Sequence, residues 1–158
     1  MSNLNAFLSQ NVLIDENVKH IVSNRFVEPV LDENGKQILG ENGKPKTKPV
    51  KWEICSITSE EDETLRKECT RKVPVPGKRN QFIPETDLNK YIGKLAARCT
   101  VFPNLKDAAL QNSYGVMGDD VLLKKMLKPG EYADYCAKVQ EVNGFQVSFE
   151  EMVDEAKN

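Results

Sequence analysis

The chain has 158 residues, of which 39% are hydrophobic and 29% are charged. This length is typical of a single domain, and the composition predicts a folded protein with a modest core and a large polar surface. Twenty-two basic and twenty-four acidic side chains give a formal net charge of −2, which excludes a general attraction to nucleic acid or anionic lipid. The apolar runs are too short for a signal peptide or a membrane span, so we expect a location in the cytoplasm.

The residues that usually carry catalysis or bind metals are sparse. Four cysteines stand apart without a Cys-x-x-Cys pair, and His20 is the only histidine. A zinc site built from local pairs is therefore not expected, and the cysteines are interpreted as reduced thiols packed like small apolar side chains. No phosphate-binding glycine motif is present, so no catalytic, metal or cofactor site is predicted. An enzyme that uses His20 or a cysteine stays open as an alternative, and it would need an apolar pocket with a shifted pKa.

The N-terminal part has strand character. Residues 4–8 can form a short helix, and residues 18–27 and 50–57 are rich in β-branched and aromatic side chains that alternate between two faces. These two runs are predicted to pair as antiparallel strands. Between them, residues 28–49 contain a near duplication, LDENGK and LGENGK, and each copy carries the Asn-Gly pair of tight hairpin turns. We expect an extended hairpin or a mobile loop there.

From residue 58 onward the pattern changes to helices. Thr58 with Glu61 forms a capping box ahead of a helix at 60–72, and prolines at 74 and 76 predict an extended, partly polyproline-like connection after it. Apolar side chains at three- and four-residue spacing then predict further helices. They span 88–101, capped by Thr86 or Asp87, then 104–111, capped by Asn104, then 119–127, 129–144 and 149–157, the last with the capping box Ser148 and Glu151.

Together these elements predict one domain over residues 1–158. Its expected fold is α+β but mainly α, with an N-terminal antiparallel β-hairpin followed by a bundle of about five short helices in residues 58–158.

A cluster of basic side chains lies in residues 66–79. A solvated helix end explains such a cluster most simply. Two functional hypotheses remain open, namely a nucleic-acid-binding regulator whose affinity falls steeply with salt and a site for an acidic or amphipathic protein segment. The cluster consists of Arg66, Lys67, Arg71, Lys72, Lys78 and Arg79.

Several segments resemble the XkdN-like tail assembly chaperones of contractile-tailed phages and of defective prophages. They are Trp52-Glu53, residues 66–79, YIGKLAA with CTVFPNL, SYGVMG at 113–118 and PGEYADY at 129–135. The resemblance implies a non-enzymatic protein that binds the tape measure protein, keeps it soluble during tail assembly and is absent from the mature virion. A structural or adaptor protein of the tail is the alternative.

A chaperone of this kind needs apolar surface that can cover the helices of a partner. The candidate partner-binding surface lies in residues 114–132, where aromatic and apolar side chains recur, although the same side chains can instead form the core. Its residues are Tyr114, Val116, Met117, Leu122, Met126 and Tyr132.

Overall fold

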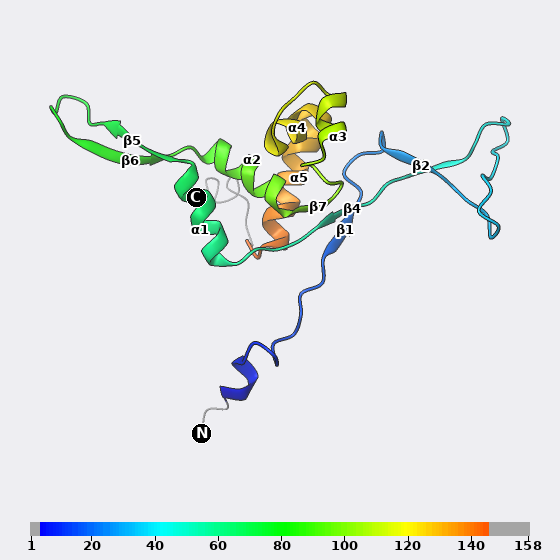
Figure 1. Cartoon of the computed structure of the whole chain (residues 1–158), viewed down its shortest axis with the longest axis horizontal. Coiled ribbons are helices and arrows are strands. Elements are labelled where there is room, and N and C mark those ends of the chain that lie inside the picture. Colours follow the sequence, from blue (N-terminus) through cyan, green and yellow to red (C-terminus); the bar gives the residue numbers. More distant parts are fainter. Residues whose placement is uncertain (1–3, 146–158) are drawn as a thin grey trace, which may run out of the picture.

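The computed structural model describes residues 4–145 (Figure 1). Within these residues the chain forms one 3-10 helix, seven strands and five α-helices. In chain order they are η1 (Leu4–Phe7), β1 (Val18–His20), β2 (Val27–Pro29), β3 (Thr47–Pro49), β4 (Trp52–Ile54), α1 (Ser59–Glu68), β5 (Thr70–Pro74), β6 (Phe82–Thr86), α2 (Leu88–Cys99), β7 (Thr100–Phe102), α3 (Ala108–Ser113), α4 (Asp119–Met126) and α5 (Pro129–Val142). The helix expected at 149–157 lies outside the described residues.

A small antiparallel sheet of β1, β4 and β7 lies at the centre, with β4 in the middle. Val18 is opposite Ile54 and His20 is opposite Trp52, so the antiparallel pairing expected between residues 18–27 and 50–57 is present, although each strand has only three residues. Along β4 the side chains of Trp52 and Ile54 are buried, whereas Glu53 between them is half-buried. This alternation places one face of the sheet against the helices.

The core is built around an aromatic contact between the sheet and α5. The rings of Trp52 and Tyr135 meet edge to face, with their centroids 5.1 Å apart, and both side chains are almost completely buried. The Tyr135 hydroxyl also lies 2.5 Å from the hydroxyl of Thr100 on β7. Tyr135 therefore connects α5 to two strands of the central sheet.

Helix α2 is the central helix of the molecule. Asp87 caps it by accepting a hydrogen bond from the backbone N–H of Lys90 at 3.1 Å. One face of α2 is buried and packs against α4 and α5, as the spacing of its apolar residues predicts. The buried residues of α2 are Tyr91, Gly93, Leu95, Ala96, Ala97 and Cys99.

The duplicated segment forms an arm on one side of the molecule (Figure 1). Strands β2 and β3 pair at its base, and each Asn-Gly turn places its glycine, Gly35 or Gly43, at positive φ. Beyond the strands, the backbones of three residues form a ring of three hydrogen bonds. Ile38 N–H donates to the carbonyl of Val30 at 2.9 Å, Lys46 N–H to that of Ile38 at 2.7 Å, and Val30 N–H to that of Lys46 at 2.8 Å. The eight-residue duplication thus supplies equivalent positions that bond one another.

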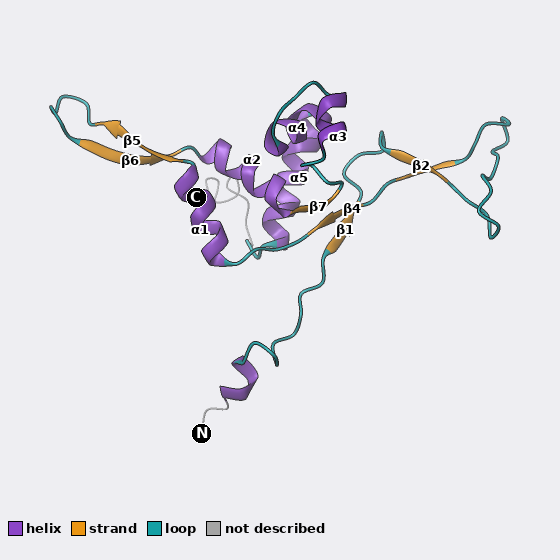
Figure 2. Ribbon diagram, viewed as in Figure 1, coloured by secondary structure: helices purple, strands orange, loops and turns teal. Residues whose placement is uncertain are grey.

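A second arm is a hairpin of β5 and β6 that extends to the opposite side (Figure 1). Thr70 pairs with Thr86 at its base, where the two hydroxyls lie 2.7 Å apart, and Pro74 pairs with Phe82 near its tip. Figure 2 shows strands in both arms and helices between them.

The prediction of a mainly α fold with a helical bundle is wrong. The described chain has three separate sheets. Helix α1 packs mainly against one other helix, α2, so the helices do not form a single bundle. The helix expected at 60–72 ends at Glu68, and the segment expected to be polyproline-like is the β5–β6 hairpin. Prolines are compatible with this hairpin because a two-stranded ribbon consists of edge strands, where a missing N–H can face solvent.

The start of one helix also differs from prediction, and the reason lies in its cap. Thr58 caps α1 as expected, by accepting from Glu61 N–H at 3.2 Å. Helix α3, however, begins at Ala108, because the carboxylate of Asp107 accepts from Leu110 N–H at 2.8 Å. Asn104, the expected cap, instead accepts from the nearby N–H of Lys106 at 3.1 Å.

Arg25 connects the segment after β1 to the junction of α4 and α5. Its guanidinium donates to the carbonyl of Met126 at 2.9 Å and to Glu131 Oε1 at 2.5 Å. The same carboxylate oxygen accepts from the backbone N–H of Lys128 at 2.8 Å, at the start of α5. Hydrogen bonds from Arg25, Ser23 and the Lys128 backbone lower the pKa of Glu131 from 4.5 to about 2.

The hydrogen-bond directions at Tyr135 give a first prediction. Thr100 donates its only hydroxyl proton to the Ala96 carbonyl at 2.7 Å, so the Tyr135 hydroxyl must donate to Thr100. Tyr135→Phe should lower the free energy of unfolding by about 1 kcal/mol, and Thr100→Val by about 2 kcal/mol or more, because only the latter leaves a buried hydroxyl unpaired. Urea unfolding followed by Trp52 fluorescence measures both, and the reverse order would contradict this assignment.

The lowered pKa of Glu131 gives a second prediction. A carboxylate whose pKa is lower in the folded state stabilises the fold fully above its ordinary pKa of 4.5, and this contribution is lost as the pH falls towards about 2. The difference in unfolding free energy between the wild type and Glu131→Gln should therefore shrink as the pH falls through this window. Urea unfolding at a series of pH values measures it, and a difference that stays constant would show that Arg25 does not hold the carboxylate.

Candidate functional site

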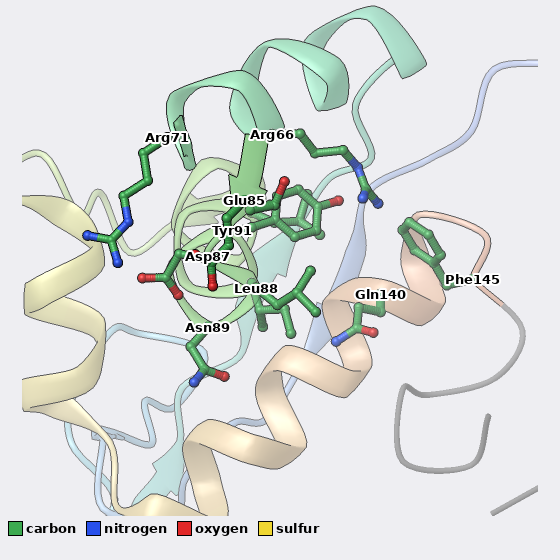
Figure 3. A pocket seen from close by; sticks show the side chains of 12 residues that line it. Arg66, Arg71, Glu85, Asp87, Leu88, Asn89, Tyr91, Gln140 and Phe145 are labelled. Carbon is green, nitrogen blue, oxygen red and sulfur yellow. The ribbon is translucent and has the colours of Figure 1, made fainter. Parts of the chain in front are cut away.

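A groove lies between the helices and the base of the β5–β6 hairpin (Figure 3). Its volume is about 810 Å³, and residues of α1, β5, β6, α2 and α5 contribute to its walls. The lining residues are Arg66, Arg71, Glu85, Thr86, Asp87, Leu88, Asn89, Tyr91, Ile92, Leu95, Gln140 and Phe145.

The floor of the groove is apolar and partly open to solvent. Leu95 is buried and Ile92 is half-buried, whereas Leu88 and Phe145 have exposed fractions of 43% and 41%. Exposed leucine and phenylalanine side chains in one concave site favour binding of an apolar surface, because covering them removes apolar area from water.

One wall is fixed by a cluster that joins α1 to α2. The Arg66 guanidinium lies 4.4 Å from the centroid of the Tyr91 ring, and its Nε donates to Asp62 at 3.0 Å. The Tyr91 hydroxyl donates to the same carboxylate. Burial, together with the hydrogen bond and charge of Asp62, raises the pKa of Tyr91 to about 12, so the phenol stays protonated and remains a donor at neutral pH.

The other end of the groove carries charges of both signs. Arg71 and Glu85 are opposite each other in the β5–β6 register, and Asp87 is the cap of α2. Figure 3 shows Arg71, Asp87 and Asn89 at this end, whereas Arg66 extends towards Phe145 at the opposite end. The groove therefore has a single arginine at the Phe145 end and a mixed polar end beyond Leu88, among the residues that line it.

The predicted basic cluster does not form a single patch. Arg66 and Arg71 line the groove, whereas Lys67 forms an exposed ion pair with Glu63 at 3.4 Å on α1. Lys72 is an exposed residue of β5, and Lys78 and Arg79 belong to the turn between β5 and β6. The structure thus brings two of the six cations into one site.

The predicted partner-binding residues also differ in exposure. Leu122 and Met126 are buried in the core, whereas Tyr114, Val116 and Tyr132 are half-buried and pack against it. Met117 has an exposed fraction of 91%. Only Met117 in this set presents most of its side chain to solvent.

Three cysteines and His20, among the side chains considered for catalysis, have pKa values shifted towards their neutral forms. The four cysteines are free thiols, and burial raises the pKa of Cys69, Cys136 and Cys99, the last to about 11. Partial burial and the charge of Lys138 lower the pKa of His20, against the opposing effect of Glu141. Within residues 4–145 no helix is long and apolar enough to cross a membrane.

Three apolar residues of the groove were not identified as functional from the sequence: Leu88, Ile92 and Phe145. Leu88 and Ile92 belong to the apolar stripe of their helix, which predicts burial, and Phe145 follows the predicted end of α5. No sequence signal shows that these positions stay partly open, because the groove is formed by elements that are distant along the chain.

Comparisons with known proteins agree with this fold. The crystal structure of the protein YqbN superimposes with a TM-score of 0.67 and 24% sequence identity, over 92% of this chain and 99% of that one. In sequence, the uncharacterized protein YqbN of Bacillus subtilis (strain 168) is 33% identical over 104 residues, which is 65% of this chain and 68% of that protein. The phage-like element PBSX protein XkdN of the same organism is 26% identical over 156 residues, covering 98% of this chain and 93% of the relative.

The family assignment follows from a match over almost the whole sequence. The model of the family described as "Phage XkdN-like tail assembly chaperone protein" matches residues 4–157. This chain therefore belongs to the XkdN-like family of phage tail assembly chaperones.

Proposed function

We propose that this chain binds the tape measure protein of its phage or prophage and keeps it soluble during tail assembly. It acts in the cytoplasm of the bacterial host and leaves before the virion is complete. The observation that carries this proposal is the groove of about 810 Å³ beside α2, with Leu88 and Phe145 exposed in it. A tape measure protein is a long helical chain, and the apolar stripe of such a helix fits a helix-in-groove mode of binding.

The charges around the groove favour a protein partner over nucleic acid. Arg66 is already engaged with Asp62 and Tyr91, and Lys67 is paired with Glu63. Glu85 and Asp87 lie in the same groove and would repel phosphates. An amphipathic helix with polar side chains of both signs suits this mixture, because its apolar face can cover Leu88 while its charged positions meet Arg71, Glu85 and Asp87.

Met117 is proposed as a second point of contact. Its side chain is 91% exposed just before α4, and the neighbouring Val121 is 47% exposed on that helix. Tyr114, Val116 and Tyr132 of the predicted set are half-buried and pack against the core. Leu122 and Met126 are buried in the core, so only the exposed part of the predicted set, chiefly Met117, is proposed to contact the partner.

Co-expression with the tape measure protein from the same genome tests the proposal. The wild-type chain should keep that protein soluble and co-purify with it. Leu88→Glu should reduce the recovered complex about tenfold, because it places a charge where a partner buries an apolar side chain worth ~1.5–3 kcal/mol. An acidic residue is tolerated in the first turn of α2, so the helix should remain folded.

Leu39→Glu is the matched control, because Leu39 is 63% exposed on the distant arm and does not line the groove. It should leave the complex unchanged. Precipitation of the tape measure protein despite the wild-type chain would refute the proposal. Finding the chain in purified tails would favour the alternative, a structural or adaptor protein.

A further inference from the structure

The β5–β6 hairpin has two faces, and one of them continues the wall of the groove. Residues that lie opposite each other across an antiparallel ribbon share a face, and successive pairs alternate between the two faces. Arg71 is opposite Glu85, and both residues line the groove. The adjacent pair, Lys72 and Pro84, lies on the other face, and neither residue lines the groove. The face with Arg71 and Glu85 is therefore the groove side of the hairpin.

Beyond this charged pair, the groove side of the hairpin is apolar. Val73 is opposite Ile83 in the register. Val75 follows on the same face, where its backbone N–H donates to the carbonyl of Gln81 at 2.9 Å. Ile83 has an exposed fraction of 50%, whereas Val73 and Val75 are half-buried. Apolar surface thus extends outwards from the groove over residues 71–75 of this strand, which span roughly 13 Å at about 3.3 Å per residue.

The position of the hairpin leaves this surface open to a partner. The hairpin extends away from the helices (Figure 1), so its groove side is covered only in part by packing between its own two strands. A two-stranded hairpin is at best marginally stable by itself in water, and an apolar partner on one face stabilises it. Apolar surface that adjoins a concave site favours a partner that covers both.

The charge of the hairpin indicates the character of the partner at this end. Residues 70–86 contain four basic side chains and one acidic side chain, Glu85. None of the four basic side chains forms an ion pair within residues 4–145. Unpaired positive charge at the surface favours acidic side chains on the partner. The four basic residues are Arg71, Lys72, Lys78 and Arg79.

We propose that the partner helix continues from the groove onto the groove side of the hairpin and carries an acidic segment towards the hairpin turn. This contact rests on the proposed function and defines the partner of that site more narrowly. The apolar stripe of the helix extends for roughly two turns beyond the groove to cover Val73 and Ile83. The acidic side chains that follow it lie near Lys78 and Arg79.

Two substitutions at neighbouring positions of β6 test the contact. Ile83 and Phe82 have similar exposed fractions, 50% and 58%, but they lie on opposite faces of the hairpin. Ile83→Glu should lower the recovery of the complex with the co-expressed tape measure protein about fivefold, because it places a charge in an apolar contact. Phe82→Glu is the matched control and should leave the recovery unchanged. Equal losses with both variants, or no loss with Ile83→Glu, would overturn the proposed contact.

Photo-cross-linking supplies a readout that does not depend on how each substitution affects the hairpin itself. A benzoylphenylalanine at position 83 should link to the tape measure protein in the purified complex, whereas the same probe at position 82 should not. A link from position 82 alone would show that the partner covers the other face. A link from position 83 to a second copy of this chain would likewise overturn the proposed contact.

The acidic segment of the partner is tested through the hairpin turn. Lys78→Glu combined with Arg79→Glu should lower the recovered complex about threefold at low salt, as expected for exposed ion pairs, and less at high salt. Unchanged recovery at low salt would refute the acidic segment. Loss of the wild-type complex on nuclease treatment would show that nucleic acid contacts the hairpin instead.

Failure of the hairpin contact is distinguishable from failure of the proposed function. A wild-type complex that forms normally and tolerates Ile83→Glu would refute the hairpin contact alone. Absence of any complex with the wild-type chain would refute the proposed function and the hairpin contact together.

Discussion

The contact between Trp52 and Tyr135 is the interaction on which the rest of the structure depends. It joins the middle strand of a sheet with only three residues per strand to the longest helix of the described chain. Strands this short gain little from their own hydrogen bonds, so the sheet must be stabilised by what packs on it. Tyr135 provides this through its ring and through its hydroxyl, which reaches Thr100 on the neighbouring strand β7.

Helix α2 connects this core to the candidate site. The buried face of α2 packs against α4 and α5, and towards its start Leu88, Ile92 and Leu95 form the floor of the groove. The groove is thus part of a rigid helix, and its wall is held by Asp62, which accepts from both Arg66 and Tyr91. A site with these supports is formed before a partner arrives, which reduces the entropy lost on binding.

Elements with strong local signals were predictable from the sequence. The capping oxygen of Thr58 and the apolar spacing of residues 88–99 depend on neighbours within one or two turns, and both helices begin within one residue of the predicted start. The β5–β6 hairpin was missed because Pro74, Pro76 and Pro84 resemble a polyproline segment, and only the pairing across the ribbon shows otherwise. Strand β7 directly follows α2, so its first two residues, Thr100 and Val101, were assigned to the end of the helix.

The candidate site was less predictable than the helices, for a related reason. Exposure of a given apolar residue depends on tertiary packing, which spacing along one helix does not contain. Leu122 and Leu88 both lie on apolar stripes, yet Leu122 is completely buried and Leu88 is 43% exposed. The candidate surface taken from residues 114–132 therefore contains core residues, and the groove from Arg66 to Phe145 required the folded chain to bring its walls together.

Hydrogen exchange of the chain alone and in complex with the tape measure protein tests the central claim most directly. Binding should slow exchange in the amides of residues 88–92 and around Arg66, while the arm at residues 27–49 should exchange as before. Slower exchange confined to that arm, with no change in α2, would contradict the assignment of the groove as the partner site.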